Sequence, residues 1–202
     1  MIASLINMLI SSKLNLVHSI TASAQVTQEF ANLRDFETGA HLERMAHYAR
    51  LIACELQQSH NLSDESIEYL YLFAPLHDIG KIGIPDRILF KSGRLDADER
   101  RSMETHAQKG MEILQRVVGE FGLEGPPDSA MMKNLVSSHH EKLDGSGYPL
   151  GLRGEAIPLE ARIIAVADVL DALTSHRRYK EAWTMDLANA ELDRLVAAGQ
   201  CC

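Results

Sequence analysis

The segment that most constrains the fold is LEARIIAVADVLDALTS, residues 159–175, which is apolar on almost every face. It follows Pro158, a residue that suits the start of a helix. A helix that is apolar all round must be enclosed by other parts of the chain, so we predict a central buried helix here. Asp168 interrupts this apolar run. A carboxylate is costly to bury unless it is paired or binds a metal.

The remaining elements that the sequence predicts are also helices. Residues 40–58 place apolar side chains on one helical face. Ser63 suits the N-cap of a second helix, which we expect to run through LFAPLHDIGKIG and to end near Gly80. Asp96 and Glu99 have the spacing of a capping box at the start of another helix. Because no segment has convincing strand alternation, the predicted fold class is all-α.

The chain divides into an N-terminal helical segment, residues 1–33, and one domain, residues 34–202. The first segment has an imperfect helical pattern of apolar residues and is predicted to be a connector or a dimerisation helix. A helix packed on its own domain is an equal alternative. Its apolar start is too short to span a bilayer and lacks the basic leader of a secretion signal.

Charge and cysteine content limit the function classes. There are 20 Lys and Arg residues against 28 Asp and Glu residues, a net charge of −8, with no basic block. Nucleic acid is therefore excluded as a partner, whereas a small anionic ligand is not. The three cysteines form no disulfide framework, which favours a cytoplasmic location.

A set of histidines and carboxylates lies at predicted helix ends or on one helix face. Imidazole suits iron, manganese and zinc, while carboxylates suit harder ions and can bridge two of them. The mixture predicts a cluster of two or more ions, which can clamp a phosphate and activate water. The set consists of Glu37, His41, His77, Asp78, His106, His139, His140 and Asp168.

Taken singly, each of these residues has a structural explanation. A histidine on an amphipathic helix is more often structural than functional, and Asp168 alone can be the buried partner of an arginine. The joint pattern, with two adjacent histidines before a glycine-rich loop, is what indicates a metal site. Glycine allows a backbone to approach a ligand closely.

Five motifs stand out: RDFETGAH (34–41), HDIGKIGIPD (77–86), His106 after LDADERRSMET, HHEKLDGSGYP (139–149) and VADVLDALTSHRRYK (166–180). Together they resemble a known family, the HD-GYP domain. These bacterial phosphodiesterases of the HD superfamily hydrolyse cyclic di-GMP. The resemblance covers about residues 34–185 and implies a helical bundle with a metal cluster in its core beside a glycine-rich loop.

The resemblance implies a ligand set for two or three divalent ions, most often iron and alternatively manganese. Asp78 matches the bridging carboxylate. Glu37 and His41 match positions used in members with a third metal, which favours three ions here. The implied ligands are Glu37, His41, His77, Asp78, His106, His139, His140 and Asp168.

The resemblance also implies catalytic roles for His77, Asp78 and Lys81, with Lys81 directed at the scissile phosphate. Attack on phosphorus by a metal-activated hydroxide would give pGpG, and a three-metal site could continue to GMP. The implied substrate-binding residues are Asp35, Lys81, Gly145, Tyr148, Asp171, Arg177 and Lys180.

The sequence departs from the family pattern at two places. Arg178 stands where many relatives have Pro, which removes a fixed φ and adds a charge. The chain also stops before a Gly-rich FDP turn, so the domain is expected to be truncated at its C-terminus. Relatives usually carry an upstream sensory or receiver domain, and a diguanylate cyclase is a further expected partner.

Two alternative functions remain open at this point. One is an HD-type hydrolase of another nucleotide, against which the DGSGYP loop argues. The other is a catalytically silent cyclic di-GMP receptor or scaffold, against which the intact ligand set argues.

Overall fold

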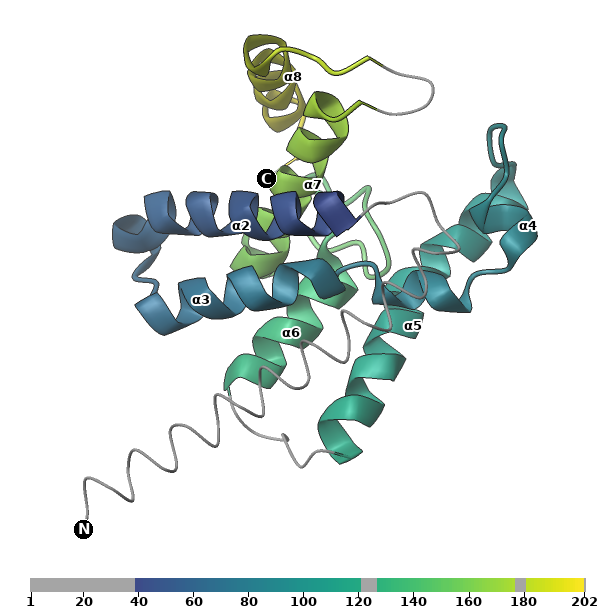
Figure 1. Ribbon diagram of the computed structural model, residues 1–202, viewed down its shortest axis with the longest axis horizontal. Coiled ribbons are helices and arrows are strands. Elements are labelled where there is room, and N and C mark those ends of the chain that lie inside the picture. The colour runs from purple at the N-terminus through teal and green to yellow at the C-terminus, as the bar shows by residue number, and fades with distance from the viewer. Residues whose placement is uncertain (1–38, 121–126, 177–180, 202) are drawn as a thin grey trace.

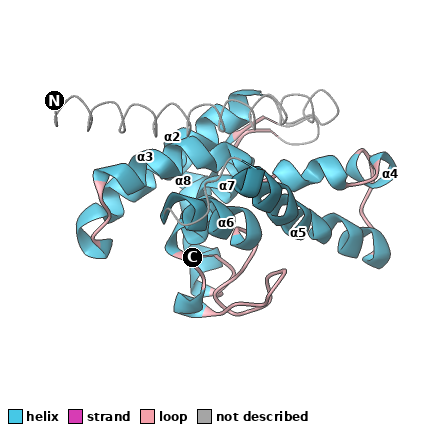
Figure 2. Ribbon diagram, turned by 90° about the horizontal axis from the view of Figure 1, so that it is seen from below, coloured by secondary structure: helices cyan, strands magenta, loops and turns pink. Residues whose placement is uncertain are grey.

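The computed structural model describes residues 39–120, 127–176 and 181–201, and within these ranges it contains helices and no strand (Figures 1 and 2). The all-α fold class is confirmed. No helix in these ranges combines the length and low polarity needed to cross a bilayer. The elements are α2 (Gly39–His60), α3 (Asp64–Phe73), the 3₁₀ helices η1 (Ala74–Leu76) and η2 (Ile79–Gly83), α4 (Asp86–Leu89), α5 (Ala97–Glu120), α6 (Pro127–Ser138), the 3₁₀ helix η3 (Gly154–Ala156), α7 (Leu159–Thr174) and α8 (Met185–Ala197).

Helix α7 is less deeply enclosed than its composition predicts: Ala161, Ile163, Ile164, Ala167 and Asp171 are buried, and its other residues are half-buried. It packs against α2, α6 and α8, while α2 lies along α3 and α6 along α5 (Figure 1). The core gathers apolar side chains from α2, α3, α6 and α7, with Leu114 from α5. Phe73, Leu135 and Ile164 are almost completely buried in it. The predicted segment of residues 1–33 lies outside the described residues.

Two predicted helix starts are confirmed by their hydrogen bonds. The Ser63 hydroxyl accepts a hydrogen bond from the backbone N–H of Ser66 at the start of α3. Before α5, the Asp96 side chain accepts from the Glu99 N–H and the Glu99 side chain accepts from the Asp96 N–H, each at 2.9 Å. This reciprocal pair is a capping box, and it satisfies donors that a helix start leaves free.

The predicted end of α3 near Gly80 is wrong. The α-helix ends at Phe73, and two short 3₁₀ helices follow. Pro75 has no N–H to donate to the carbonyl four residues earlier, so the α-helical pattern cannot continue through it. As a result His77 and Asp78 lie in a tight bend between η1 and η2 rather than on a helix.

Helix α5 approaches η2 so closely that Gly80 has no room for a side chain. A Cβ on Gly80 would lie 1.9 Å from the carbonyl oxygen of His106 and 2.4 Å from the backbone nitrogen of Gly110. Both obstacles are backbone atoms, which cannot rotate away. This contact holds the bend with Asp78 directly against the segment of α5 that carries His106.

We predict that Gly80→Ala separates η2 from α5 and lowers the free energy of unfolding by about 1–3 kcal/mol, the usual cost of overpacking. Gly93→Ala is the matched control, because a Cβ on Gly93 meets nothing within 4 Å. Chemical denaturation of both variants measures the difference. Equal stability of the two variants would contradict the close packing described here.

Candidate metal centre

Two groups of side chains converge between α2, α5, α6 and α7. In the first, Asp78, His106, His139 and His140 offer ligand atoms that all lie within 4.8 Å of one another. In the second, His41, His77 and Asp168 do the same. These seven residues are predicted ligands, and the fold brings them together. The eighth, Glu37, lies outside the described residues.

Three imidazoles, those of His77, His106 and His139, are each held from behind through the Nδ1 atom. His77 Nδ1 lies 2.9 Å from the carbonyl oxygen of Ala74, and His106 Nδ1 lies 2.8 Å from that of Met103. His139 Nδ1 lies 3.1 Å from the carbonyl oxygens of Leu135 and Val136. A carbonyl oxygen can only accept a hydrogen bond, so Nδ1 carries the proton in these three rings.

This arrangement directs the Nε2 lone pairs toward the centre of the site. His106 Nε2 lies 3.3 Å from Asp78 Oδ1, and His139 Nε2 lies 3.8 Å from the same oxygen. All three atoms are buried and have no hydrogen-bond partner among the described residues. Lone pairs that face one another in a protein interior repel unless a cation lies between them. The donor set therefore fits a divalent ion, and anchored imidazoles are the usual way to present Nε2 to one.

Asp78 connects the two groups. Its Oδ2 lies 3.0 Å from His77 Nε2 in the second group, while its Oδ1 faces His106 and His139 in the first. One carboxylate thus offers an oxygen to each side. This is the geometry that a bridging ligand between two ions requires.

Burial and charge keep these groups in the protonation states that metal binding needs. Burial alone would raise the pKa of Asp78, but the charge of Lys81 and the adjacent His77 ring hold it well below its usual range. Burial lowers the pKa of His106 to about 4, against the opposing attraction of Asp78. Burial and the neighbouring His139 also lower the pKa of His140. The carboxylate is ionised and both imidazoles are neutral at pH 7, as ligands must be.

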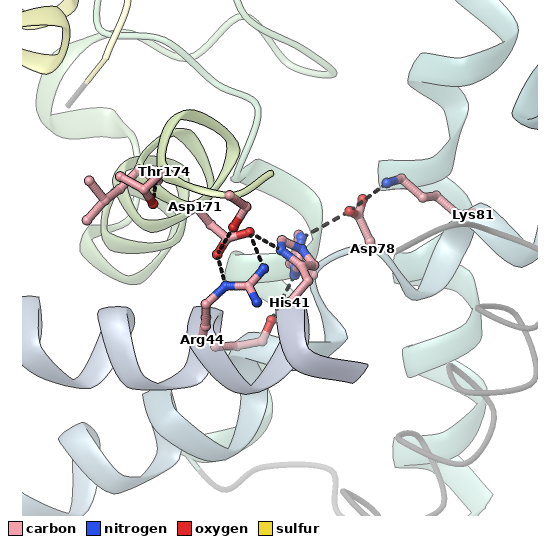
Figure 3. A network of polar contacts seen from close by, with 10 residues as sticks. His41, Arg44, Asp78, Lys81, Asp171 and Thr174 are labelled. Atoms are coloured by element: carbon pink, nitrogen blue, oxygen red, sulfur yellow. Dashed lines mark hydrogen bonds and ion pairs between the residues drawn. The ribbon is translucent and has the colours of Figure 1, made fainter. Parts of the chain in front are cut away.

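His41 is anchored by a carboxylate instead of a carbonyl (Figure 3). Its Nδ1 donates to Asp171 Oδ2 at 2.7 Å. Arg44 donates to both oxygens of Asp171, and the Ser175 hydroxyl donates to Oδ1. Burial would raise the pKa of Asp171, but the hydrogen bonds from His41 and Arg44 outweigh it and hold the pKa far below its usual range.

Asp171 was expected from the resemblance to contact substrate, and the geometry favours another role. Its side chain is only 1% exposed, and both oxygens are occupied by protein donors. Asp171, which lies on α7, therefore orients the imidazole of His41, which lies on α2. No local pattern indicates this pair, because 130 positions separate the two residues.

Glu141 is a second residue whose role the sequence did not predict. It is buried, and its carboxylate accepts hydrogen bonds from the backbone N–H of Leu150 at 2.7 Å and of Leu152 at 2.9 Å. Glu141 thereby fastens the far end of the glycine-rich loop to the turn that carries His139 and His140. Its position directly after the two histidines is the only hint in the sequence, since its partners are backbone groups.

The glycine-rich loop folds back onto the same turn. A Cβ on Gly147 would lie 2.5 Å from the His140 carbonyl oxygen and from the Glu141 Cα, so only glycine fits. Gly145 has a φ of +77°, which also favours glycine. Tyr148 then stacks on His140, with ring centres 4.6 Å apart, and burial raises its pKa. The loop forms one wall of the site.

The other predicted substrate residues divide into two sets. Lys81 is described, and its Nζ lies 2.9 Å from Asp78 Oδ2, at the edge of the site with 20% of its side chain exposed (Figure 3). Asp35, Arg177 and Lys180, together with Arg178, lie outside the described residues.

Comparisons of the sequence with known proteins identify related families. The family model for the HD domain matches residues 6–198. The chain is 52% identical, over 79% of its length, to the cyclic di-GMP phosphodiesterase response regulator RpfG of Xanthomonas campestris. It is 42% identical, also over 79% of its length, to the 3'3'-cGAMP-specific phosphodiesterase 2 of Vibrio cholerae. It spans only 39% and 28% of these two relatives.

A solved structure has the same fold. Bd1817, a HDG"Y"P protein from Bdellovibrio bacteriovorus, superposes with a TM-score of 0.54 at 19% identity. The match covers 92% of this chain and 55% of that one. At this level of identity the match extends to the fold alone.

We predict that Asp171→Asn weakens metal binding at the group of His41, His77 and Asp168 by about 10–100-fold, the usual effect of removing a partner behind a ligand histidine. Titration of the metal-free protein with Mn²⁺ measures it, with the exposed Asp193→Asn on α8 as control. A titration identical to that of the control would show that Asp171 does not position His41.

We predict that Glu141→Ala frees the far end of the loop and lowers the free energy of unfolding by about 2–4 kcal/mol, because two charge-assisted hydrogen bonds are lost. Hydrogen exchange should accelerate at the N–H groups of Leu150 and Leu152 before other parts of the molecule. Glu155→Ala, at an exposed position in η3, is the control. Unchanged exchange at both N–H groups would contradict the role given to Glu141.

Proposed function

The chain belongs to the HD domain family, and on that premise we propose that it is a metal-dependent phosphodiesterase that hydrolyses cyclic di-GMP. The observation that carries this proposal is the pair of ligand groups joined by Asp78. Two ions held side by side suit a phosphodiester better than a single structural ion does. Relatives named as cyclic di-GMP phosphodiesterases, including RpfG, support the choice of substrate.

The two groups would hold two divalent ions, and Glu37 would join His41 as a ligand of a third. Iron is the first choice and manganese the second, because both accept mixed imidazole and carboxylate ligands. When bound, such ions neutralise phosphate charge and activate water. The buried, anchored imidazoles hold their ligand atoms in place before any ion arrives.

Lys81 is the side chain that we assign to the reacting phosphate. Its ammonium lies against Asp78 at the edge of the site, where it neutralises charge that develops on the phosphate or the leaving 3′ oxygen. We assign Gly145 and Tyr148 to the neighbouring substrate wall. Asp35, Arg177 and Lys180 are proposed to complete the contacts with ribose, base and phosphate. The first product would be pGpG, and a three-ion site would carry it on to GMP.

We also propose how the domain is connected, which partners it has and where in the cell it lies. Residues 1–33 would connect it to an upstream sensory or receiver domain or pair two copies as a homodimer. The response regulator named among the relatives supports the first arrangement. We place the protein in the cytoplasm, with a diguanylate cyclase as a further partner.

One alternative substrate has specific support. Relatives of similar identity are named as 3'3'-cGAMP-specific phosphodiesterases, so this second cyclic dinucleotide is a candidate. It shares the phosphodiester ring and one guanine with cyclic di-GMP. Parallel assays of both substrates decide between them.

The test is an anaerobic assay of metal content and hydrolysis on one sample. We expect Lys81→Met to lower kcat by about 10²–10³, as for other groups that stabilise charge in a transition state, with metal content unchanged. Lys133→Met on α6 is the control, and His139→Ala should lose metal and turnover together. Tight binding of cyclic di-GMP without hydrolysis, in a protein that holds its metals, would favour the silent receptor instead.

A further inference from the structure

A pocket lies beside the candidate metal centre. It has a volume of about 340 Å³ and is lined by Arg94, Leu95, Arg100, Met103, Glu104 and Tyr148. Ligand pockets for small molecules begin at about 300 Å³, so this pocket suits one nucleobase with its sugar rather than a whole cyclic dinucleotide.

The pocket and the metal centre share two structural parts. Tyr148 lines the pocket and stacks on the candidate ligand His140 at 4.6 Å. Met103 also lines the pocket, and its carbonyl oxygen anchors His106 Nδ1 at 2.8 Å. A molecule in the pocket is therefore next to anything bound at the metals, as a base is next to its own phosphate.

The charged groups of the pocket are available for a ligand. Arg100 and Glu104 are one helical turn apart on α5, so they lie on the same face. Arg94 comes from the loop before α5. Among the described residues, no hydrogen bond or ion pair engages the side chains of Arg94, Arg100 or Glu104. Leu95 and Met103 add an apolar surface between them.

This combination matches the edges of guanine. Guanidinium groups donate to the O6 and N7 acceptors of guanine, which is the commonest specific contact that arginine makes with a base. A carboxylate accepts from the N1–H and N2–H₂ donors on the opposite edge. Adenine presents an acceptor at N1 and a donor at N6, so the same groups would face it with the wrong polarity. Apolar and aromatic side chains cover the faces of the base.

We propose that this pocket is a guanine-binding subsite, in which Glu104 reads the N1–H and N2–H₂ edge and Arg94 and Arg100 read O6 and N7. The inference deepens the proposed function and rests on it, because it assigns one base of the substrate to a place beside the metals. Glu104 is then a specificity residue for guanine over adenine.

The test is the preference for 5′-GMP over 5′-AMP, measured as two dissociation constants by calorimetry on the metal-loaded protein. We expect the wild type to prefer GMP by about tenfold or more, the effect of one hydrogen bond to a charged group. Glu104→Gln should abolish most of this preference, and Arg100→Met should weaken GMP binding more than AMP binding. Glu112→Gln and Arg116→Met, exposed positions on the same helix, should keep it.

The outcomes separate this inference from the proposed function. If Glu104→Gln keeps the full preference, or weakens GMP and AMP equally, the pocket is not a guanine subsite, even if cyclic di-GMP is hydrolysed. If the preference depends on Glu104 but the wild type hydrolyses no cyclic dinucleotide, the subsite stands and the proposed phosphodiesterase falls.

Discussion

The hydrogen bond behind three of the candidate ligand imidazoles is the interaction on which the site depends. His77, His106 and His139 donate Nδ1–H to carbonyl oxygens three or four residues earlier in the chain. Each of these bonds fixes the tautomer of its ring and directs Nε2 inward.

The packing of the bundle then determines where these lone pairs meet. Pro75 ends α3 and bends the chain at His77 and Asp78, and Gly80 lets that bend lie directly against α5. Asp78 consequently reaches His106 and His139, which come from two other parts of the chain. Burial keeps His106 neutral, while Lys81 and His77 keep Asp78 ionised. The result is a buried group of acceptors with too few donors, which a cation would satisfy.

The sequence predicted the parts of this account that depend on local signals. The caps at Ser63 and Asp96 follow from short patterns. The motifs also named the seven side chains that the fold brings together, whose role as metal ligands stays a prediction. The sequence misplaced the end of α3, because an apolar helical pattern continued past Pro75. It also could not predict the partners of Asp171 and Glu141. Those contacts depend on how distant segments pack, and the partners of Glu141 are backbone groups that no side-chain pattern marks.

The central claim is that anchored imidazoles present Nε2 to metal ions on both sides of Asp78. An anomalous diffraction map from crystals grown anaerobically with Mn²⁺ tests it most directly. The account predicts an ion bonded to Nε2 of His106 and His139, a second ion bonded to Nε2 of His77, and a carboxylate oxygen of Asp78 on each. Ions bonded through Nδ1, or ions that leave Asp78 uncoordinated, would contradict it.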